Sequence, residues 1–192
     1  SAVKLRQSRR EVKQLQTRLE ALSESDKDAP LMIGESKAMQ EVFANIHQLS
    51  NTDANILILG ENGTGKDLVA RSLRHFSGRQ QAPFVTIDLG SVPESLFESE
   101  LFGYEKGAFT DARKAKAGRM EVASGGTLFL DEIGNLSLAM QSKLLTAIEK
   151  RQISRLGATR SIPINIRLIC ATNADIRQMV EDGTFRQDLL YR

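Results

Sequence analysis

A glycine-rich segment between an apolar run and a helix-like stretch could bind the phosphates of a nucleotide. Glycines let backbone N–H groups close around phosphate oxygens, the helix N-terminus adds its dipole, and a lysine at the end of the loop adds a mobile positive charge. The order of strand, loop and helix is what a P-loop requires, and it separates this segment from an ordinary tight turn. We therefore expect a nucleoside triphosphate to be bound by Gly60, Glu61, Asn62, Gly63, Thr64, Gly65 and Lys66.

Carboxylates at two places could serve a magnesium ion and a water molecule. Asp67 stands where P-loops usually carry a Ser or Thr whose hydroxyl contacts Mg²⁺. A carboxylate can also hold Mg²⁺, and it can stabilise the first turn of a helix through the dipole; the two roles are compatible. Asp131 and Glu132 end the mostly apolar run 127–130. A buried strand there would bring Asp131 to the metal and let Glu132 polarise a water, although such residues often only cap strands.

An asparagine at the end of a later apolar run could complete this site. Asn173 follows Ala171 and Thr172. If that run is a neighbouring strand, the side chain of Asn173 would lie beside the γ-phosphate and hold the attacking water. Asparagine at a strand end is also a common turn former, so the prediction depends on the elements around it.

A parallel sheet is needed to bring these residues together. Short apolar runs that alternate with helix-like segments are typical of a parallel sheet covered by helices on both faces, which is an α/β fold. Ligands bind at the carboxyl ends of the strands in such sheets, where the P-loop would lie. We expect strands at 56–59, 84–87, 127–130 and 164–171, and helices at 37–49, 67–76, 138–150 and 176–182.

Length and composition narrow the class of protein. The 192 residues suffice for one α/β domain and an appendage, and the net charge of +2 is too small to argue for a polyanionic partner. The single cysteine, Cys170, lies in an apolar run and reads as a buried thiol, without a disulfide framework or a metal-binding spacing. No apolar run approaches the length of a bilayer span, and no signal peptide is evident. We expect a cytoplasmic protein with no membrane partner.

The first residues differ from the rest of the chain. Residues 1–23 carry apolar side chains at heptad positions, which predicts a coiled-coil helix that would join two copies into a dimer. A single amphipathic helix that packs on its own domain is the alternative. Residues 24–30 are polar, end in a proline and read as a linker, and the core domain is expected at 31–192. The heptad residues are Leu5, Val12, Leu15, Leu19 and Leu22.

Three longer motifs make the core resemble a known family. They are residues 98–112, with the sequence ESELFGYEKGAFTDA, residues 125–132, GGTLFLDE, and residues 185–192, FRQDLLYR. From about Leu31 to Arg192 the chain is similar to bacterial enhancer-binding proteins, the AAA+ activators of sigma-54 RNA polymerase. The resemblance implies an AAA+ P-loop NTPase fold and Mg²⁺-dependent ATP hydrolysis that remodels the sigma-54 holoenzyme. The N-terminal helix resembles the linker of NtrC-type response regulators in two-component systems.

The resemblance also assigns roles to individual residues. Lys66 would bind the β- and γ-phosphates, Asp131 the magnesium, and Glu132 would activate water with Asn173 as the sensor of the γ-phosphate. Arg186 and Arg192 resemble fingers that reach into the site of a neighbouring subunit, where a guanidinium stabilises transition-state charge; an ordinary surface ion pair is the alternative. Such sites require a ring, expected to be a hexamer or heptamer. In addition to the P-loop, Ile33 and Gly34 are expected to bind the nucleotide.

A short loop is expected to contact sigma-54. An exposed Phe109 would be its aromatic anchor, and a core aromatic is the alternative. The family has glycine where this chain has Asp111, which tolerates a left-handed backbone less well and adds a negative charge. Either the partner is adjusted to this charge, or the protein is a nucleotide-dependent oligomeric regulator that acts without sigma-54. The loop comprises Gly107, Ala108, Phe109, Thr110, Asp111 and Ala112.

Asp88 is a second departure from the family, which usually has asparagine there to restrain the catalytic glutamate. An ionised Asp88 cannot donate a hydrogen bond to Glu132, and two close carboxylates repel or share a proton. We therefore expect the switch to act through a third group, a basic residue or a water.

The family's helical lid, its receiver domain and its DNA-binding domain are absent from these 192 residues. We expect this chain alone to hydrolyse ATP weakly and to form rings weakly. DNA binding is expected only through a C-terminal domain outside the chain.

Overall fold

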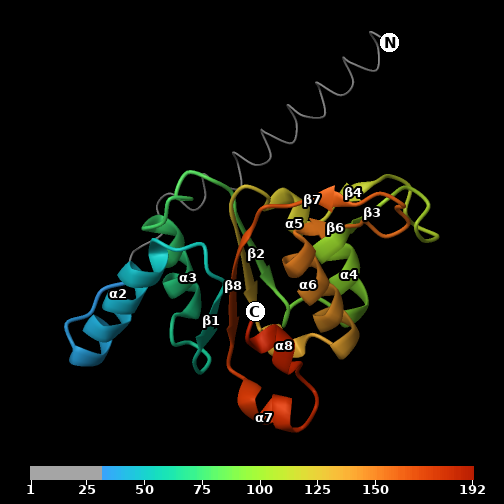
Figure 1. Cartoon of the computed structure of the whole chain (residues 1–192). Helices are drawn as coiled ribbons and strands as arrows, with labels where there is room; N and C mark the ends of the chain where they lie inside the picture. Colours follow the sequence, from blue (N-terminus) through green and yellow to red (C-terminus); the bar gives the residue numbers. More distant parts are fainter. Residues whose placement is uncertain (1–31) are drawn as a thin grey trace.

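A four-stranded parallel sheet forms the centre of the computed structural model, which describes residues 32–192. The strands are β1 (Ile56–Leu59), β2 (Phe84–Asp88), β5 (Thr127–Asp131) and β8 (Arg167–Thr172), in the order β1-β8-β5-β2 (Figure 1). The expected parallel α/β fold is confirmed. The predictions for residues 1–23 and 24–30 lie outside the described residues.

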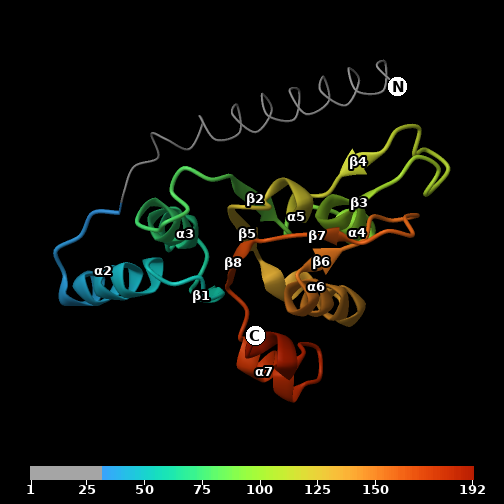
Figure 2. The same cartoon turned by 45° about the horizontal axis from the view of Figure 1, so that its top comes forward.

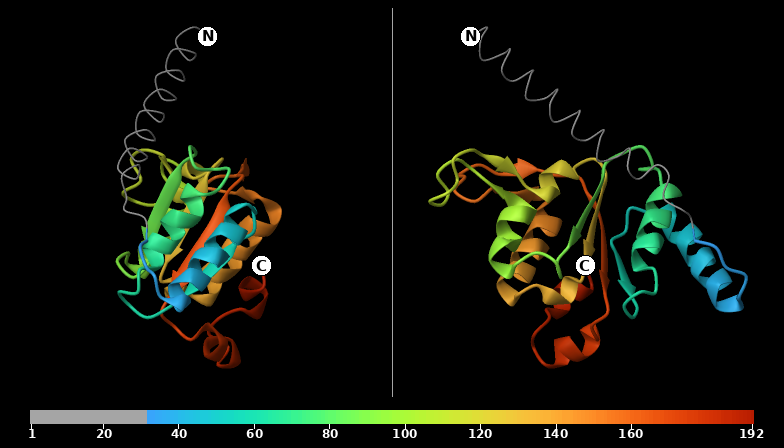
Figure 3. Two further views of the ribbon diagram at one scale, coloured as in Figure 1. Left: turned by 90° about the vertical axis from the view of Figure 1, so that its left-hand side faces the viewer. Right: turned by 180° about the vertical axis from the view of Figure 1, so that it is seen from behind.

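Helices cover both faces of this sheet. Helices α2 (Lys37–Ser50) and α3 (Lys66–His75) lie on one face, and α4 (Glu94–Phe102), α5 (Arg119–Val122) and α6 (Leu138–Lys150) lie on the other (Figures 1 and 3). Because successive side chains of a strand point to opposite faces, each strand feeds two cores. Phe84, Phe129 and Ile169 pack with α2 and α3, whereas Val85, Leu128 and Leu168 pack with α4 and α6. None of the helices in the described part of the chain is long and apolar enough to cross a membrane.

Two small hairpins project together from one edge of the molecule (Figure 2). One pairs β3 (Gly103–Tyr104) with β4 (Lys116–Ala117), and the other pairs β6 (Gln152–Ile153) with β7 (Ile162–Pro163). Backbone bonds join them, from the amide of Glu105 to the carbonyl of Leu156 (2.9 Å) and from the amide of Leu156 to the carbonyl of Gly103 (3.0 Å). The loops at their tips are therefore held side by side. The 3₁₀ helix η1 (Ile133–Asn135), α7 (Ile176–Glu181) and α8 (Gln187–Leu190) complete the described fold.

The strand predicted at 164–171 begins later than expected. It starts at Arg167, because the residues just before it bond outside the sheet: the amide of Ile164 donates to the carbonyl of Arg151 (2.9 Å), and the carbonyl of Asn165 accepts the amide of Gly125 (2.8 Å). The other predicted strands and helices are confirmed with ends shifted by at most a residue or so. Cys170 is buried in β8 as expected, and burial raises the pKa of its thiol to about 12.

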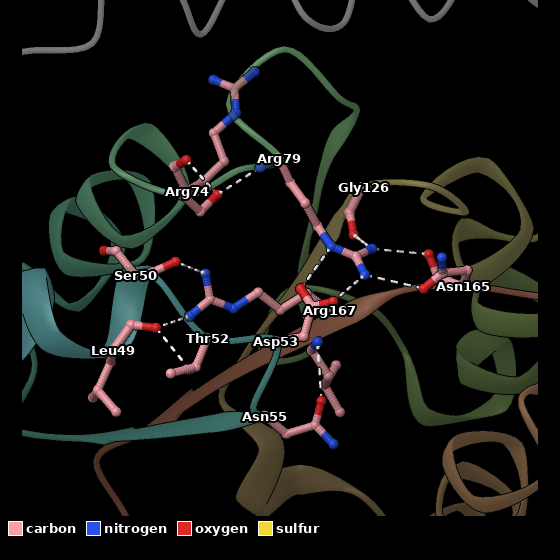
Figure 4. A network of polar contacts seen from close by, with 12 residues as sticks. Leu49, Ser50, Thr52, Asp53, Asn55, Arg74, Arg79, Gly126, Asn165 and Arg167 are labelled. Atoms are coloured by element: carbon pink, nitrogen blue, oxygen red, sulfur yellow. Dashed lines mark hydrogen bonds and ion pairs between the residues drawn. The ribbon is translucent and has the colours of Figure 1, made fainter.

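One arginine joins the amino ends of all four strands (Figure 4). Arg79 precedes β2, and its guanidinium donates to both carboxylate oxygens of Asp53 (3.0 Å each), which precedes β1. It also donates to the carbonyl of Gly126 (3.0 Å), before β5, and to the carbonyl (3.1 Å) and side-chain oxygen (3.0 Å) of Asn165, before β8. Every N–H donor of the guanidinium is thus used. We call this group of four residues the Arg79 clasp.

Candidate nucleotide-binding and hydrolysis site

The P-loop lies at the carboxyl end of β1, as the sequence predicts. Gly63 (φ 78°) and Gly65 (φ 87°) have left-handed backbones, which glycine adopts without steric cost. Lys66 opens α3 and is only 8% exposed. Its ammonium donates to the carbonyls of Gly60 (3.0 Å) and Glu61 (3.2 Å), so the loop is folded around the charge that phosphates would meet.

The acidic pair lies at the end of the neighbouring strands. Asp131 ends β5, and Glu132 follows it with a left-handed backbone (φ 57°, ψ 47°). Such a backbone costs of the order of 1–3 kcal/mol at a residue other than glycine and is concentrated at functional sites. The carboxylate of Glu132 lies 3.8 Å from the ammonium of Lys66. Its other oxygen is 3.5 Å from the hydroxyl of Thr172 and 3.4 Å from the amide of Asn173, which both donate to it.

The strand order brings the predicted residues together, because β1, β8 and β5 are neighbours. Lys66, Asp131, Glu132 and Asn173 therefore meet at one edge of the sheet. Sequence reasoning missed Thr172, which is fully buried at the end of β8 and contacts Glu132. The signal was available, since a hydroxyl at the end of an apolar strand needs a polar partner.

Asp88 lies opposite Asp131 in the register of β2 and β5. One of its carboxylate oxygens accepts the amide of Gly90 at 2.8 Å, which turns the side chain back onto its own loop. Burial, followed by the charges of Glu132 and Asp88, raises the pKa of Asp131, against the opposing effects of the Glu132 amide and Lys66. The site therefore favours a positive charge beside Asp131.

The donor set fits Mg²⁺, which prefers carboxylate oxygen and keeps several waters. Asp131 supplies a half-buried carboxylate whose pKa is raised, by burial first and then by the neighbouring charges of Glu132 and Asp88. Asp67 is exposed in the first turn of α3 and lies 3.9 Å from Arg71, one turn further on. A role of Asp67 at the metal remains a prediction.

The two predicted finger arginines form ion pairs within the chain. Arg186 donates to both carboxylate oxygens of Asp188 (2.9 and 2.6 Å), which raises the pKa of Arg186. Arg192 binds Glu149 (3.1 Å). Both side chains are exposed at the surface. Ile33 is 94% exposed, and the carbonyl of Gly34 accepts the side-chain amide of Gln40 (3.0 Å).

The predicted contact loop is a closed turn at the tip of the β3–β4 hairpin. The amide of Gly107 donates to the carbonyl of Ala112 (2.8 Å), and that of Ala112 donates to the carbonyl of Phe109 (2.9 Å). Phe109 is 44% exposed with its ring 4.9 Å from that of Tyr104, so the core-aromatic alternative is wrong. Among the described non-glycine residues only Glu132 and Arg151 have a positive φ. Asp111 therefore adds a charge at this tip but no left-handed strain.

A bifurcated ion pair braces the two loops. Arg155 donates to Glu121 (2.6 and 2.9 Å) and to Glu105 at the base of the contact loop (3.1 Å). These contacts, the one to Glu121 first, raise the pKa of Arg155. A cavity of about 670 Å³ lies below, between α6 and the β6–β7 hairpin, and Ala108 is part of its wall. This cavity is separate from the P-loop, none of whose residues line it.

Comparison with known proteins agrees with this geometry. Residues 32–192 match the family described as the Sigma-54 interaction domain. The Nif-specific regulatory protein of Herbaspirillum seropedicae is 46% identical over 100% of this chain, and the transcriptional regulatory protein ZraR of Salmonella typhimurium is 52% identical over 84% of it. The chain spans 34% and 36% of the length of these relatives. The crystal structure of NtrX from Brucella abortus in complex with ATP gives a TM-score of 0.79 at 34% identity, covering 90% of this chain and 37% of that one.

Proposed function

The chain belongs to the family of sigma-54 interaction domains, AAA+ P-loop NTPases of sigma-54-dependent transcriptional activators, and we propose that it hydrolyses ATP to remodel sigma-54 RNA polymerase. The observation that carries the proposal is the meeting of Lys66, Glu132 and the Thr172–Asn173 strand end at the carboxyl edge of the sheet. Remodelling of the holoenzyme would then allow promoter opening.

The hydrolysis step follows from the positions of these groups. Lys66 would exchange the carbonyls of Gly60 and Glu61 for the β- and γ-phosphate oxygens. Asp131, with Asp67 as a second candidate, would hold Mg²⁺, whose charge neutralises the phosphates. Glu132 would leave Lys66 and accept a proton from the attacking water. The side chain of Asn173 would hold that water at the γ-phosphate.

Arg186 and Arg192 are proposed to complete the site of a neighbouring subunit in a hexameric or heptameric ring. Their present partners, Asp188 and Glu149, are exposed or half-exposed, so the exchange needs little desolvation. Residues 1–23 are proposed to hold a dimer, and a role in a two-component response regulator would place a receiver domain before them. DNA binding is proposed for a C-terminal domain outside this chain.

Asp88 is proposed to act on Glu132 through Lys66. The carboxylate of Asp88 is bound by the amide of Gly90, whereas that of Glu132 faces Lys66, Thr172 and Asn173. We propose that the third group expected from the sequence is a basic one, Lys66, which lies 3.8 Å from Glu132 and whose charge, like that of Asp88, acts on Asp131. The variant Asp88→Asn would remove one negative charge, strengthen the hold of Lys66 on Glu132 and lower basal hydrolysis. Unchanged basal and partner-stimulated rates would overturn this role.

Sigma-54 binding is tested with a protein that carries residues 1–192 and a lid, mixed with sigma-54 and a transition-state mimic of ATP hydrolysis. We expect a stable co-complex on a sizing column that Phe109→Ala abolishes. Leu138→Ala is the matched control, because Leu138 is similarly exposed (47% against 44%) at the start of α6. Loss with both variants, or with neither, would contradict the role of Phe109.

The same experiment distinguishes the sigma-54-dependent function from the second candidate function. A regulator that acts without sigma-54 was suggested by Asp111, and the structure leaves only its charge as a reason. The variant Asp111→Gly removes that charge. If ATP is hydrolysed and rings form but no complex appears with either the wild type or the Asp111→Gly variant, the sigma-54-independent function is favoured.

A further inference from the structure

Arg167 is a fully buried arginine at the start of a strand that otherwise carries apolar side chains up to Thr172. A buried guanidinium is strongly unfavourable unless hydrogen bonds and opposite charge compensate it. No carboxylate in the described part of the chain forms an ion pair with Arg167. The nearest candidate, Asp53, is bound by Arg79 in the clasp. The charge of Asp53 acts on Arg167 without an ion pair and opposes the effect of burial, so hydrogen bonds must supply the remaining compensation.

The last turn of α2 supplies it. The guanidinium of Arg167 donates to the carbonyls of Leu49 (2.8 Å) and Ser50 (3.4 Å), as Figure 4 shows. The final carbonyls of a helix lack partners within the helix and carry the negative end of its dipole. Arg167 therefore caps α2 from the sheet, and α2 is in turn its counter-charge.

This cap fixes α2 along its axis. The other contacts of α2 with the domain are apolar, from Ile46, Val42 and Phe43 to the cluster formed with α3 and the sheet. Apolar contacts are non-directional, so they hold the helix on the sheet without specifying how far it slides. The two hydrogen bonds from Arg167 join α2 to a strand that is paired on both sides, to β1 and to β5.

The opposite end of α2 carries predicted nucleotide-binding residues. Its 14 residues form a rod of about 21 Å, and Figures 1 and 3 show its first turn at the same end of the molecule as the P-loop. The side chain of Gln40 ties this turn to the carbonyl of Gly34 (3.0 Å). A Cβ on Gly34 would lie 2.9 Å from Met39, so the segment is packed closely onto the helix. Ile33 stands beside it, 94% exposed.

We propose that Arg167 is a positioning residue that sets α2, and with it Ile33 and Gly34, at the height needed to hold the base and ribose of the nucleotide. An exposed apolar side chain beside a glycine backbone suits a purine, which offers an apolar face and polar edges. The phosphates are held separately by the P-loop. This inference rests on the proposed ATP binding, and it concerns only the base-dependent part of the affinity.

The test compares ATP with inorganic tripolyphosphate, which has the phosphates but no base or ribose. Binding of each, with Mg²⁺, is measured by calorimetry for the wild type, Arg167→Lys and Arg167→Met. We expect Arg167→Met to weaken ATP binding about tenfold, or about 1.4 kcal/mol, and to leave tripolyphosphate binding within about twofold. Arg167→Lys keeps the positive charge and serves as the test if Arg167→Met does not fold. We expect it to lose an intermediate amount of ATP affinity.

Arg74→Met is the matched control. Arg74 is also a buried arginine (7% exposed) bound to a carbonyl, but it lies in α3 and its bond goes to Ala82, in the loop before β2, rather than to the end of α2 (3.3 Å). The Arg74→Met variant should be less stable than the wild type and should leave the ratio of ATP to tripolyphosphate affinity unchanged. Equal weakening of both ligands by Arg167 variants, or no weakening of ATP, would overturn the inference. A wild type that binds neither ligand would instead refute the proposed function.

Discussion

The Arg79 clasp predicts that a residue remote from the P-loop controls the stability of the whole sheet. The change that tests it is Arg79→Met, which keeps the apolar stem and removes the guanidinium. Arg79 makes three hydrogen bonds to neutral acceptors, one to Gly126 and two to Asn165, and each bond contributes about 1 kcal/mol to stability. The bidentate pair with Asp53 adds below about 1 kcal/mol because Asp53 is 73% exposed. We expect a loss of about 3 kcal/mol in the free energy of unfolding, which lowers Tm by about 6–12 °C in a domain of this size.

Urea unfolding followed by circular dichroism measures this loss, and ATP binding below the transition should be unchanged. Arg79→Lys separates charge from geometry, because an ammonium cannot satisfy acceptors in three segments at once; we expect it to recover less than half of the loss. Arg113→Met is the control, an exposed arginine whose removal should cost below about 0.5 kcal/mol. If Arg79→Lys were as stable as the wild type, the argument from hydrogen-bond geometry would be refuted.

Three further predictions concern acid, chemistry and the contact loop. The hydrogen bond from Arg79 lowers the pKa of Asp53 in the folded state. The contribution of Asp53 to the free energy of unfolding is therefore present above its unfolded pKa and is lost as the pH falls through the lower folded pKa. The free energies of unfolding of the wild type and Asp53→Asn should converge between about pH 5 and 2. Glu132→Gln should keep ATP binding and lower the hydrolysis rate at least about 100-fold, measured by phosphate release, and a smaller loss would exclude Glu132 as the base. Arg155→Met removes the ion pairs that hold Glu105, at the base of the contact loop, and Glu121, so it should weaken the sigma-54 co-complex on a sizing column with ATP affinity unchanged.

The parts of the site whose residues are contiguous in the sequence could be predicted. The P-loop and the Asp131–Glu132 pair each combine a local apolar run with a local chemical signature, and the sheet places them where expected. The start of β8 was predicted wrongly, because residues 164–166 form a connection between the two-residue strand β7 and β8, and the amide of Ile164 bonds to Arg151 rather than to the sheet. Such short strands are fixed by tertiary contacts rather than by propensity.

The polar network at the amino edge could not have been predicted. Asp53, Arg79, Gly126 and Asn165 lie in separate loops, and only the strand order brings them together. Arg167 did leave a signal, since it is the charged residue in the run 166–171. The sequence did not identify the carbonyls of α2 as its partners, because backbone acceptors carry no side-chain signature.

The charges at the carboxyl edge of the sheet argue that metal and nucleotide bind together. Asp88, Asp131 and Glu132 bring three carboxyl groups to neighbouring strand ends, and the ammonium of Lys66 lies 3.8 Å from the carboxylate of Glu132. A nucleoside triphosphate adds further negative charge, so free ATP would meet repulsion that the α3 dipole alone does not offset. We propose that a divalent cation held between Asp131 and the phosphates would turn this repulsion into attraction. The arriving phosphate oxygens would compete with Glu132 for the ammonium of Lys66, which would weaken the hold of Lys66 on that carboxylate. Binding of the metal-bound nucleotide and release of the catalytic carboxylate are then one electrostatic event.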